Sequence, residues 1–431
     1  GQVPRSHANC ADPVAKGLVS PFSVYASVPL GLSDVLAQEM SSILSVPLSE
    51  LRIERTGVRV RTNALGVMRL NLHSRIAQRV LIEVQHANYR NEDEVYAAAA
   101  AVSWEDWFGA DQSIRVDVTA NRCPLKSIHF AALRVKDAVV DRFRDRVGKR
   151  PDVNTHRPDV RLHLHLDESQ LQLSVDTSGD PLFKRGWRED KGDAPLKENL
   201  AAALLALSGW SQPLGDSPSG CSQGLALFDP CCGSGTLVIE AAQVACAIAP
   251  GLMRGFGFEA LKPFDPTEWR RLVEAARAAI HAPLAPVFGS DVAFRMVDFA
   301  RRNAQRAGVA DSTQFRGGDA LQRNPPIDRP GWMVLNPPYG ERIEAAGVAG
   351  ARQHAQVADG QDFMARLASH WKQQFAGWQA WVLSPDLELP GRMRMKASRR
   401  TPVWNGPIEC RLFRFELVAG SHRRGAERGG D

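Results

Sequence analysis

The 431-residue sequence predicts an α/β protein, with a mostly parallel sheet in its C-terminal half and smaller α+β units before it. From residue 227 onward, short apolar strands alternate with amphipathic helices, which is typical of a parallel sheet covered on both faces. Before that point, alternating strands are mixed with fewer helices. The length exceeds the roughly 100–200 residues of one domain, so two or three domains are expected.

The composition indicates a soluble globular protein, with 44% apolar and 23% charged residues. No apolar run approaches the ~18–20 residues that cross a bilayer, and the first residues lack the apolar core of a signal peptide. A cytoplasmic location without membrane contact is therefore expected. The seven cysteines lack the paired spacing of zinc sites, so we expect reduced thiols and no metal.

The net charge of +5 is modest, but the basic residues are clustered. The clusters are Arg142, Arg144, Arg146, Lys149 and Arg150; then Arg392, Arg394, Lys396, Arg399 and Arg400; and finally Arg423, Arg424 and Arg428 near the end. Any one cluster could be an ordinary solvated face. Together they favour a polyanionic partner such as nucleic acid.

The first folded unit is expected to be small and of α+β type. After a polar tail, "FSVYASV" alternates as a strand does, and a helix follows with its apolar residues on one side. Strands are predicted in "LRIERTGVRVRT" (51–62), and a helix near "VMRLNLHSRIAQRVLIEV" (67–84).

A second unit begins near residue 92. The pattern predicts a helix over 92–108, a strand over 113–121, a long helix over 127–148 and a hairpin over 160–178. His163 and His165 alternate on one of these strands. Because no third ligand lies near them in the sequence, an exposed strand is favoured over a metal site.

The third unit carries the chemistry. Its strands are expected at "LALFD", "APVFGSD", "STQFRGGDA", "WMVLN", "WQAWVLSP" and "CRLFRFELV". In open parallel sheets, ligands bind at the carboxyl ends of the strands. The ends of the first four strands each carry a distinctive polar residue.

The first of these ends is "LFDPCCGSGT", in which Asp229 closes the strand and Gly233 and Gly235 allow a tight turn against a ligand. The following helix offers free N–H groups to an anion. Such a turn occurs in nucleotide folds of many functions. Cys231 and Cys232 are interpreted as small residues in a crowded turn.

Acidic residues mark the next two strand ends. Asp291 closes "VFGSD", where an acid of this fold accepts hydrogen bonds from ribose hydroxyls, and Asp319 in "GGDA" could accept from an adenine amine. Each acid alone could equally be a helix N-cap. At consecutive strand ends they predict a bound nucleoside.

The fourth strand runs into "NPPYGER". Pro337 and Pro338 make a rigid turn and donate no N–H, which leaves the Pro337 carbonyl beside the Asn336 side-chain carbonyl as a pair of acceptors. Tyr339 offers a flat face for stacking. The site is suited to a planar ring that carries an exocyclic amine, although a strand simply ended by two prolines is the alternative.

In this order, "DPCCGSGT", "GSD", "GGDA" and "NPPYGER" resemble the class I S-adenosylmethionine-dependent methyltransferases that modify exocyclic nitrogens. With "FKRGWREDKGDAPLKENLAAALLALSGW", "NGPIECRLFRFEL" and the N-terminal units, the chain resembles the THUMP-containing RNA guanine-N2 methyltransferases that act on bacterial 23S rRNA. The resemblance spans about residues 22–418. Some members carry a second methyltransferase on the same chain, and this sequence ends after a short basic tail, so that second activity is expected to be absent.

The resemblance implies a Rossmann-like methyltransferase domain with a mostly parallel seven-stranded sheet, preceded by ferredoxin-like and THUMP domains. The expected divisions are a disordered tail at 1–20, the ferredoxin-like unit at 21–90, the THUMP domain at 91–180, a linker at 181–195, the methyltransferase domain at 196–418 and a basic tail at 419–431.

The resemblance also implies roles for particular residues. Asp229, Gly233 and Gly235 would line the methionine end of S-adenosylmethionine, Asp291 its ribose and Asp319 its adenine, with further contacts from Lys197 and Asn199. Asn336, Pro337 and Tyr339 would hold the target guanine, with Pro338 and Arg342 as further substrate contacts and Arg342 on a phosphate.

The expected activity is methyl transfer to N2 of a guanine in 23S rRNA, with the base flipped out of its stack. The partner would be large-subunit rRNA or its assembly precursor, and a monomer is expected. The alternatives are N2-guanine methylation of tRNA, methylation of adenine N6 or another amine, and a non-enzymatic RNA-binding assembly factor.

Overall fold

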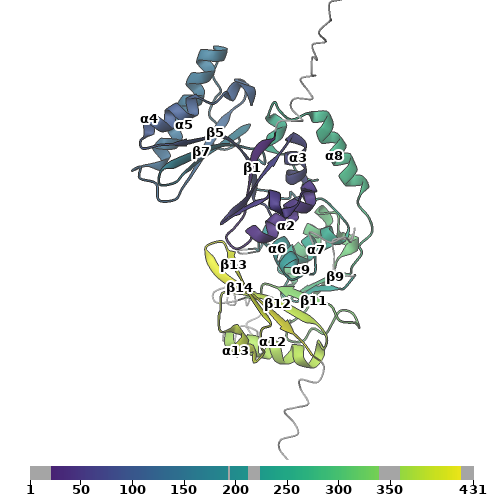
Figure 1. The fold of residues 1–431 in the computed structure, drawn as a ribbon. Coiled ribbons are helices and arrows are strands. Elements are labelled where there is room, and N and C mark those ends of the chain that lie inside the picture. The colour runs from purple at the N-terminus through teal and green to yellow at the C-terminus, as the bar shows by residue number, and fades with distance from the viewer. Residues whose placement is uncertain (1–20, 193–194, 212–223, 339–359, 419–431) are drawn as a thin grey trace, which may run out of the picture.

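The computed structural model describes residues 21–192, 195–211, 224–338 and 360–418, and it is built on two seven-stranded sheets (Figure 1). Tyr339 and Arg342, both predicted to contact the substrate, lie outside these residues. Within the described chain, no helix has the length and apolar character that a membrane span requires.

The first sheet has the strand order β2-β3-β1-β4-β7-β6-β5. Its N-terminal elements are β1 (Phe22–Ser27), α2 (Ser33–Leu44), β2 (Arg52–Glu54), β3 (Gly57–Thr62), α3 (Ala64–His73) and β4 (Arg79–Asn88). The elements that follow are α4 (Glu92–Ala100), β5 (Ile114–Ala120), α5 (Ile128–Val147), β6 (Val160–Leu166) and β7 (Gln170–Asp176).

The helix expected near residues 67–84 is wrong in its second half. The helix ends at His73, and Arg79–Asn88 form β4. This strand is central in the sheet, pairing with β1 on one side and β7 on the other. A strand covered by neighbours on both edges is rich in apolar residues, and a short apolar run cannot be told from a buried helix by periodicity alone.

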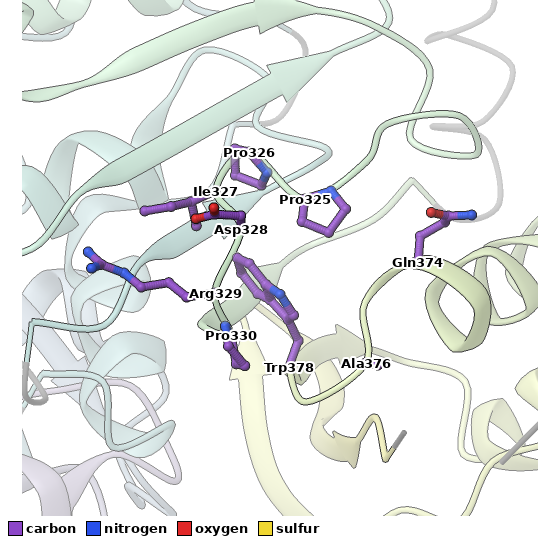
Figure 2. Close-up of a pocket in the computed structure, with 9 residues that line it drawn as sticks. All are labelled: Pro325, Pro326, Ile327, Asp328, Arg329, Pro330, Gln374, Ala376 and Trp378. Carbon is purple, nitrogen blue, oxygen red and sulfur yellow. The ribbon is translucent and has the colours of Figure 1, made fainter. Parts of the chain in front are cut away.

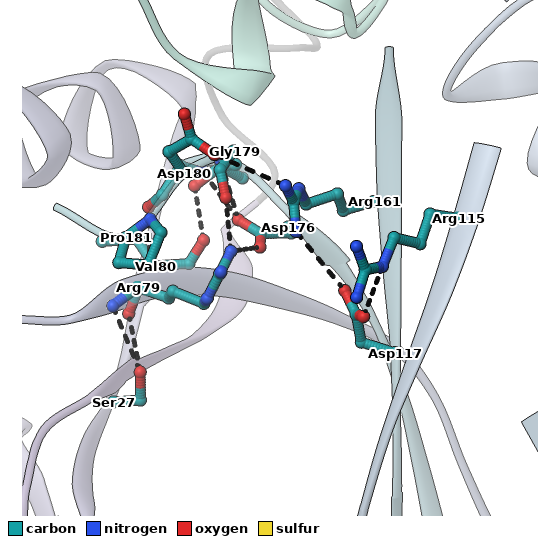
Figure 3. Close-up of polar contacts among 12 residues, drawn as sticks. Ser27, Arg79, Val80, Arg115, Asp117, Arg161, Asp176, Gly179, Asp180 and Pro181 are labelled. Carbon is teal, nitrogen blue, oxygen red and sulfur yellow. Dashed lines mark hydrogen bonds and ion pairs between the residues drawn. The ribbon is translucent and has the colours of Figure 1, made fainter. Parts of the chain in front are cut away.

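Ion pairs cross the junction where β4 and β7 join the two halves of this sheet (Figure 3). Arg79 Nη1 donates to Asp176 Oδ2 at 2.5 Å. Arg161 lies 3.8 Å from Asp117 Oδ2, and Arg115 Nε donates to Asp117 Oδ1 at 2.8 Å. These arginines therefore have carboxylate partners within the protein.

The second sheet has the order β10-β9-β8-β11-β12-β14-β13, and its first five strands are parallel. Its strands are β8 (Leu227–Asp229), β9 (Val287–Asp291), β10 (Gln314–Gly317), β11 (Trp332–Leu335), β12 (Gln379–Ser384), β13 (Arg399–Asn405) and β14 (Ile408–Glu416). Its helices are α6 (Glu198–Leu207), α7 (Thr236–Ala245), α8 (Pro266–Ala278), α9 (Phe294–Arg306), α12 (Gly360–Gln374) and α13 (Leu389–Met393). The predicted mostly parallel, seven-stranded sheet is confirmed.

A buried polar network joins the N-terminal unit to the second sheet. Arg185 Nη2 lies 2.6 Å from Glu240 Oε1, with both side chains almost fully buried, and the same nitrogen donates to the Arg75 carbonyl at 2.8 Å. Arg75 donates in turn to the carbonyl of Ile248 at 2.8 Å, and its backbone N–H donates to Glu39 Oε2 at 2.9 Å. The contacts hold the two units in one orientation.

Candidate functional site

The carboxyl ends of β8, β9, β10 and β11 meet along one edge of the second sheet, because these strands are parallel neighbours. Asp229 and Asp291 are the last residues of β8 and β9, Asp319 follows β10 by two residues, and Asn336 directly follows β11. The structure therefore brings the predicted strand-end residues to one edge.

The glycine-rich turn after β8 is joined to β9 by hydrogen bonds. The N–H of Cys232 donates to the Ser290 carbonyl at 2.9 Å, and the N–H of Gly233 donates to Asp291 Oδ2 at 3.0 Å. Gly233 has a φ of 53°, and a Cβ added there would meet no atom within 4 Å. The backbone at Gly233 therefore faces open space, as a surface for a ligand requires.

Gly235 is needed for a different reason. Its φ is 92°, and a Cβ added there would lie 2.9 Å from Ala300 Cβ on α9. The residue therefore lets the start of α7 pack closely on α9. The two glycines therefore have separate functions: Gly233 faces the open side of the turn, and Gly235 allows α7 and α9 to pack closely.

Asp229 is 2% exposed, and one of its oxygens accepts from the Cys231 N–H at 2.9 Å. Burial, with the nearby charge of Asp291, raises the pKa of Asp229 to about 8. Burial also raises the pKa of Asp291. Buried carboxyl groups at this edge favour a cationic or hydrogen-bond-donating ligand, which would stabilise their ionised forms.

The two other acids are fixed by backbone N–H groups. Asp291 accepts from Ala293 at 2.9 Å and from Gly233, while Asp319 accepts from Leu321 at 2.9 Å. The N–H of Gly318 donates to the Asp291 carbonyl at 3.0 Å, which ties the turn after β10 to the end of β9. Both carboxylates are oriented before any ligand binds.

Phe294 is a site residue that the sequence analysis missed. It begins α9, three residues after Asp291, and it is 82% exposed. A Cβ added to Gly317 would lie 3.0 Å from a carbon of its ring, so the ring lies over the end of β10. The exposed ring offers a free apolar face at the ends of β9 and β10, where Asp291 and Asp319 lie.

Asn336 supplies an unsatisfied acceptor. Its Oδ1 is inaccessible to solvent and has no hydrogen-bond partner among the described residues. Pro337 is buried and Pro338 half-buried behind it. Because a buried acceptor without a partner costs free energy, its presence at the end of β11 indicates a place where a ligand N–H can donate.

Lys197 and Asn199 lie at the start of α6 and contact other parts of the chain. The Lys197 ammonium is 4.9 Å from the centre of the Phe183 ring. Asn199 is 1% exposed, and its Nδ2 donates to the Ile76 carbonyl at 3.4 Å, whereas its Oδ1 lacks a partner in the described chain. Their contacts are with the linker and the N-terminal unit.

Arg188 is a second residue that the sequence analysis missed. Its guanidinium pairs with Glu198 and donates to Ser234 Oγ at 2.8 Å and to Thr236 Oγ1. Ser234 and Thr236 belong to the glycine-rich turn. Arg188 thus connects that turn to α6. In the sequence, Arg188 stands in "GWRED", far from the glycine-rich turn, so no local pattern predicted the contact.

A pocket of about 420 Å³ lies elsewhere on the same sheet (Figure 2). Two residues that line it lie just before strands: Pro330 is two residues before β11, and Trp378 directly precedes β12. Since Asn336 lies at the other end of β11, the pocket is at the opposite edge from the acids and is no part of the candidate site.

His163 and His165, favoured as strand residues, both lie within hydrogen-bond distance of Thr119 Oγ1, at 3.2 and 2.8 Å. Burial lowers the pKa of His163 to about 4. In the part of the chain that the structure describes, no group of three or more His, Cys, Asp or Glu side chains has the arrangement of a metal site.

Three ranges of the chain match known domain families. Residues 23–81 match the RlmL ferredoxin-like domain, residues 89–176 the THUMP domain, and residues 185–414 the RMKL-like methyltransferase domain. The last range covers more than half of the 431 residues.

Similar proteins carry the name ribosomal RNA large subunit methyltransferase K/L. The protein of Syntrophotalea carbinolica is 38% identical over 406 residues, which are 93% of this chain and 54% of the relative. That of Pseudomonas putida strain W619 is 35% identical over 423 residues, 95% of this chain and 55% of the relative. The chain thus spans little more than half the length of these relatives.

Solved structures share the whole described architecture. A methyltransferase crystallised with SAH is 25% identical, with a TM-score of 0.79 over 92% of this chain and 98% of that one. A Listeria monocytogenes protein described as a predicted N6-adenine-specific DNA methylase is also 25% identical, with a TM-score of 0.78 over 94% of this chain and 98% of that one.

Proposed function

The chain belongs to the RMKL-like methyltransferase domain family, and on this premise we propose that it transfers a methyl group from S-adenosylmethionine to N2 of a guanine in 23S rRNA. The relatives named for large-subunit rRNA methylation and the THUMP match support an RNA substrate. The neighbour crystallised with SAH supports the cofactor.

The cofactor would lie along the edge formed by β8, β9 and β10. Asp229, Gly233 and Gly235 would line its methionine end, where the buried Asp229 carboxyl suits the amino group. Asp291 would accept from the ribose hydroxyls. Lys197 and Asn199 would add contacts from the start of α6.

The adenine would occupy the space beside Asp319. Its exocyclic amine would donate to the Asp319 carboxylate, and its ring would cover the exposed face of Phe294. Stacking on an aromatic side chain suits any flat base. The 82% exposure of Phe294 in the chain without its cofactor supports this assignment.

The observation that carries the substrate assignment is the buried Oδ1 of Asn336, which has no hydrogen-bond partner among the described residues. The two N–H bonds of a guanine amine would donate to this oxygen and to the Pro337 carbonyl. Tyr339 would stack on the base, Pro338 would keep the turn rigid, and Arg342 would contact a phosphate. A target base in a duplex cannot reach such a pocket, so it would be flipped out, at a cost of a few kcal/mol.

The reaction needs placement more than acid–base catalysis. When bound, the cofactor supplies a methyl group already activated by its sulfonium. The guanine amine is a poor nucleophile because its lone pair is delocalised into the ring. Acceptors at Asn336 and Pro337 would favour a pyramidal nitrogen, aim its lone pair and stabilise the positive charge that grows on it. The excess proton then leaves to these acceptors or to water.

The nucleosides that the enzyme modifies test this assignment. Mass spectrometry of rRNA nucleosides from a strain that lacks the gene should show loss of N2-methylguanosine, and primer extension should locate the position. Loss of N6-methyladenosine would favour the adenine alternative, which the Listeria structure's description also suggests. Loss confined to tRNA would favour tRNA as the substrate.

An assembly factor without catalysis would show no loss of a modified nucleoside and no binding of SAH in calorimetry.

The proposed activity implies a cytoplasmic location, where rRNA is assembled into subunits. All groups of the proposed site come from one chain, so a monomer is expected to be active, which sedimentation during turnover can test.

A further inference from the structure

The basic clusters of this chain differ in how far they are neutralised. On α5, Arg142 Nη2 pairs with Glu105 at 2.9 Å, and Lys149 just beyond the helix pairs with Asp111. The arginines of the first sheet shown in Figure 3 are paired as well. Paired cations retain little attraction for a polyanion. Arg144 and Arg146 on the same helix are exposed and form no ion pair with a carboxylate of the described residues, so this cluster is only partly neutralised.

A groove of about 380 Å³ lies between α12 and α13. It is lined by Leu321, Ala365, Arg366, Ser369, His370, Lys372, Gln373, Met393 and Arg394. No carboxylate is among these residues. Arg366, Lys372 and Arg394 form no ion pair with any carboxylate in the described ranges, although Lys372 Nζ donates to the Arg394 carbonyl at 2.9 Å.

The unpaired cations of the groove also repel one another. Burial and the neighbouring Arg394 lower the pKa of Lys372. The same character continues along the chain, since Lys396, Arg399 and Arg400 are exposed and, within the described chain, have no carboxylate partner. A bound polyanion would offset the repulsion between these cations.

The groove adjoins the candidate site through one turn. Leu321 lines the groove, and its N–H donates to the Asp319 carboxylate at 2.9 Å. His370, also in the lining, lies 2.6 Å from the Arg323 carbonyl at the end of that turn. A strand held in the groove would therefore pass beside the Asp319 end of the candidate site.

We infer that the α12–α13 groove binds the phosphates of the RNA strand that delivers the target base, with Arg366 and Arg394 as its principal exposed cations. The inference rests on the proposed function. It places the strip from α12 to β13 along the RNA backbone, where its cations contribute to the salt-dependent part of binding.

The test is the double variant Arg366→Gln/Arg394→Gln, with Arg270→Gln/Arg277→Gln as its matched control. The control pair is exposed on α8, away from α12 and α13 in Figure 1, and removes the same charge. The probe is a fluorescein-labelled single-stranded RNA of mixed sequence, with affinity measured by anisotropy over a range of KCl concentrations.

For single strands the salt slope is about 0.7 per neutralised phosphate, so loss of two contacts should lower it by about 1.4 and weaken binding roughly 25-fold at ~0.1 M salt. The control should keep the wild-type slope. An unchanged slope in the groove variant, or an equal change in the control, would overturn the inference.

Titration with SAH separates this inference from the proposed function. The groove variant should bind SAH as the wild type does, which also shows that it is folded. If wild-type protein fails to bind SAH, the proposed function fails whatever the RNA result. If SAH binds normally and the salt slope is unaltered, only the groove assignment fails.

Discussion

Replacing Asn336 by alanine should reduce turnover without loss of stability. The variant removes the unpaired Oδ1 acceptor and with it one of the two preorganised acceptors proposed for the amine. Loss of a single such group costs about 10²–10³ in turnover, or about 2.7–4 kcal/mol of transition-state stabilisation. The affinity for SAH should be unchanged, because the proposed cofactor contacts are made by other residues.

The same change should leave the free energy of unfolding unchanged or raise it. A buried acceptor without a partner costs about 1–3 kcal/mol in the folded state. The small cavity left by alanine costs about 1 kcal/mol. The free energy of unfolding should therefore be unchanged or higher by up to about 2 kcal/mol, by the difference between these two costs.

The assay is transfer of labelled methyl groups to rRNA from a strain that lacks the enzyme, with urea unfolding and SAH calorimetry on the same preparation. Asn336→Asp, which keeps an acceptor oxygen, is the matched variant and should retain more turnover than Asn336→Ala. Wild-type turnover in the alanine variant would remove Asn336 from the mechanism. A marked loss of stability would mean that Oδ1 already has a structural partner.

Four further predictions concern the cofactor edge and the contact between units. Binding of the SAH amino group should favour the ionised form of Asp229, whose pKa is raised to about 8. The affinity for SAH should therefore rise between about pH 6 and 8, by at most about tenfold per pH unit. Calorimetry should show that binding releases a proton. Asp229→Asn should abolish that pH dependence; its persistence would refute this assignment. The raised pKa also means that the folded chain keeps a proton that the unfolded chain has lost, so the Asp229 contribution to stability should fall as pH rises from about 4 to 8. Phe294→Ala should weaken SAH binding by about 5- to 160-fold, which corresponds to the ~1–3 kcal/mol of one stacked base. Phe299→Ala on the same helix should leave SAH binding unchanged; equal effects would argue against stacking. Glu240→Ala should lower the free energy of unfolding by about 3–5 kcal/mol in urea, because buried Arg185 loses its carboxylate; a loss under about 1 kcal/mol would contradict this account of the pair.

The motifs at the strand ends were readable from the sequence because each is local. A strand, its terminal acid and the following glycines or prolines lie within a few residues, and parallel strands necessarily share one edge. The class I methyltransferase fold that these motifs indicated is confirmed, and so are the ferredoxin-like and THUMP folds implied by the resemblance of the whole chain. The roles of Asp229, Asp291, Asp319 and Asn336 remain proposals.

The local sequence pattern could not assign a short apolar run that is compatible with both a helix and a strand. Residues 79–84 were expected to continue a helix, but partners on both sides, β1 and β7, make them part of a strand. Those partners are distant in sequence, so no local pattern could choose between the two structures.

The amino-acid order alone was enough to predict the layered α/β architecture and the strand ends that share one edge of its second sheet. Tertiary structure decided which groups have free bonding capacity. At that edge they are the exposed ring of Phe294 and the Asn336 oxygen, which has no partner among the described residues. In the groove beside it they are Arg366 of α12 and Arg394, directly after α13. Burial and charge pairing depend on residues brought together from distant parts of the chain, so they arise only when the protein folds.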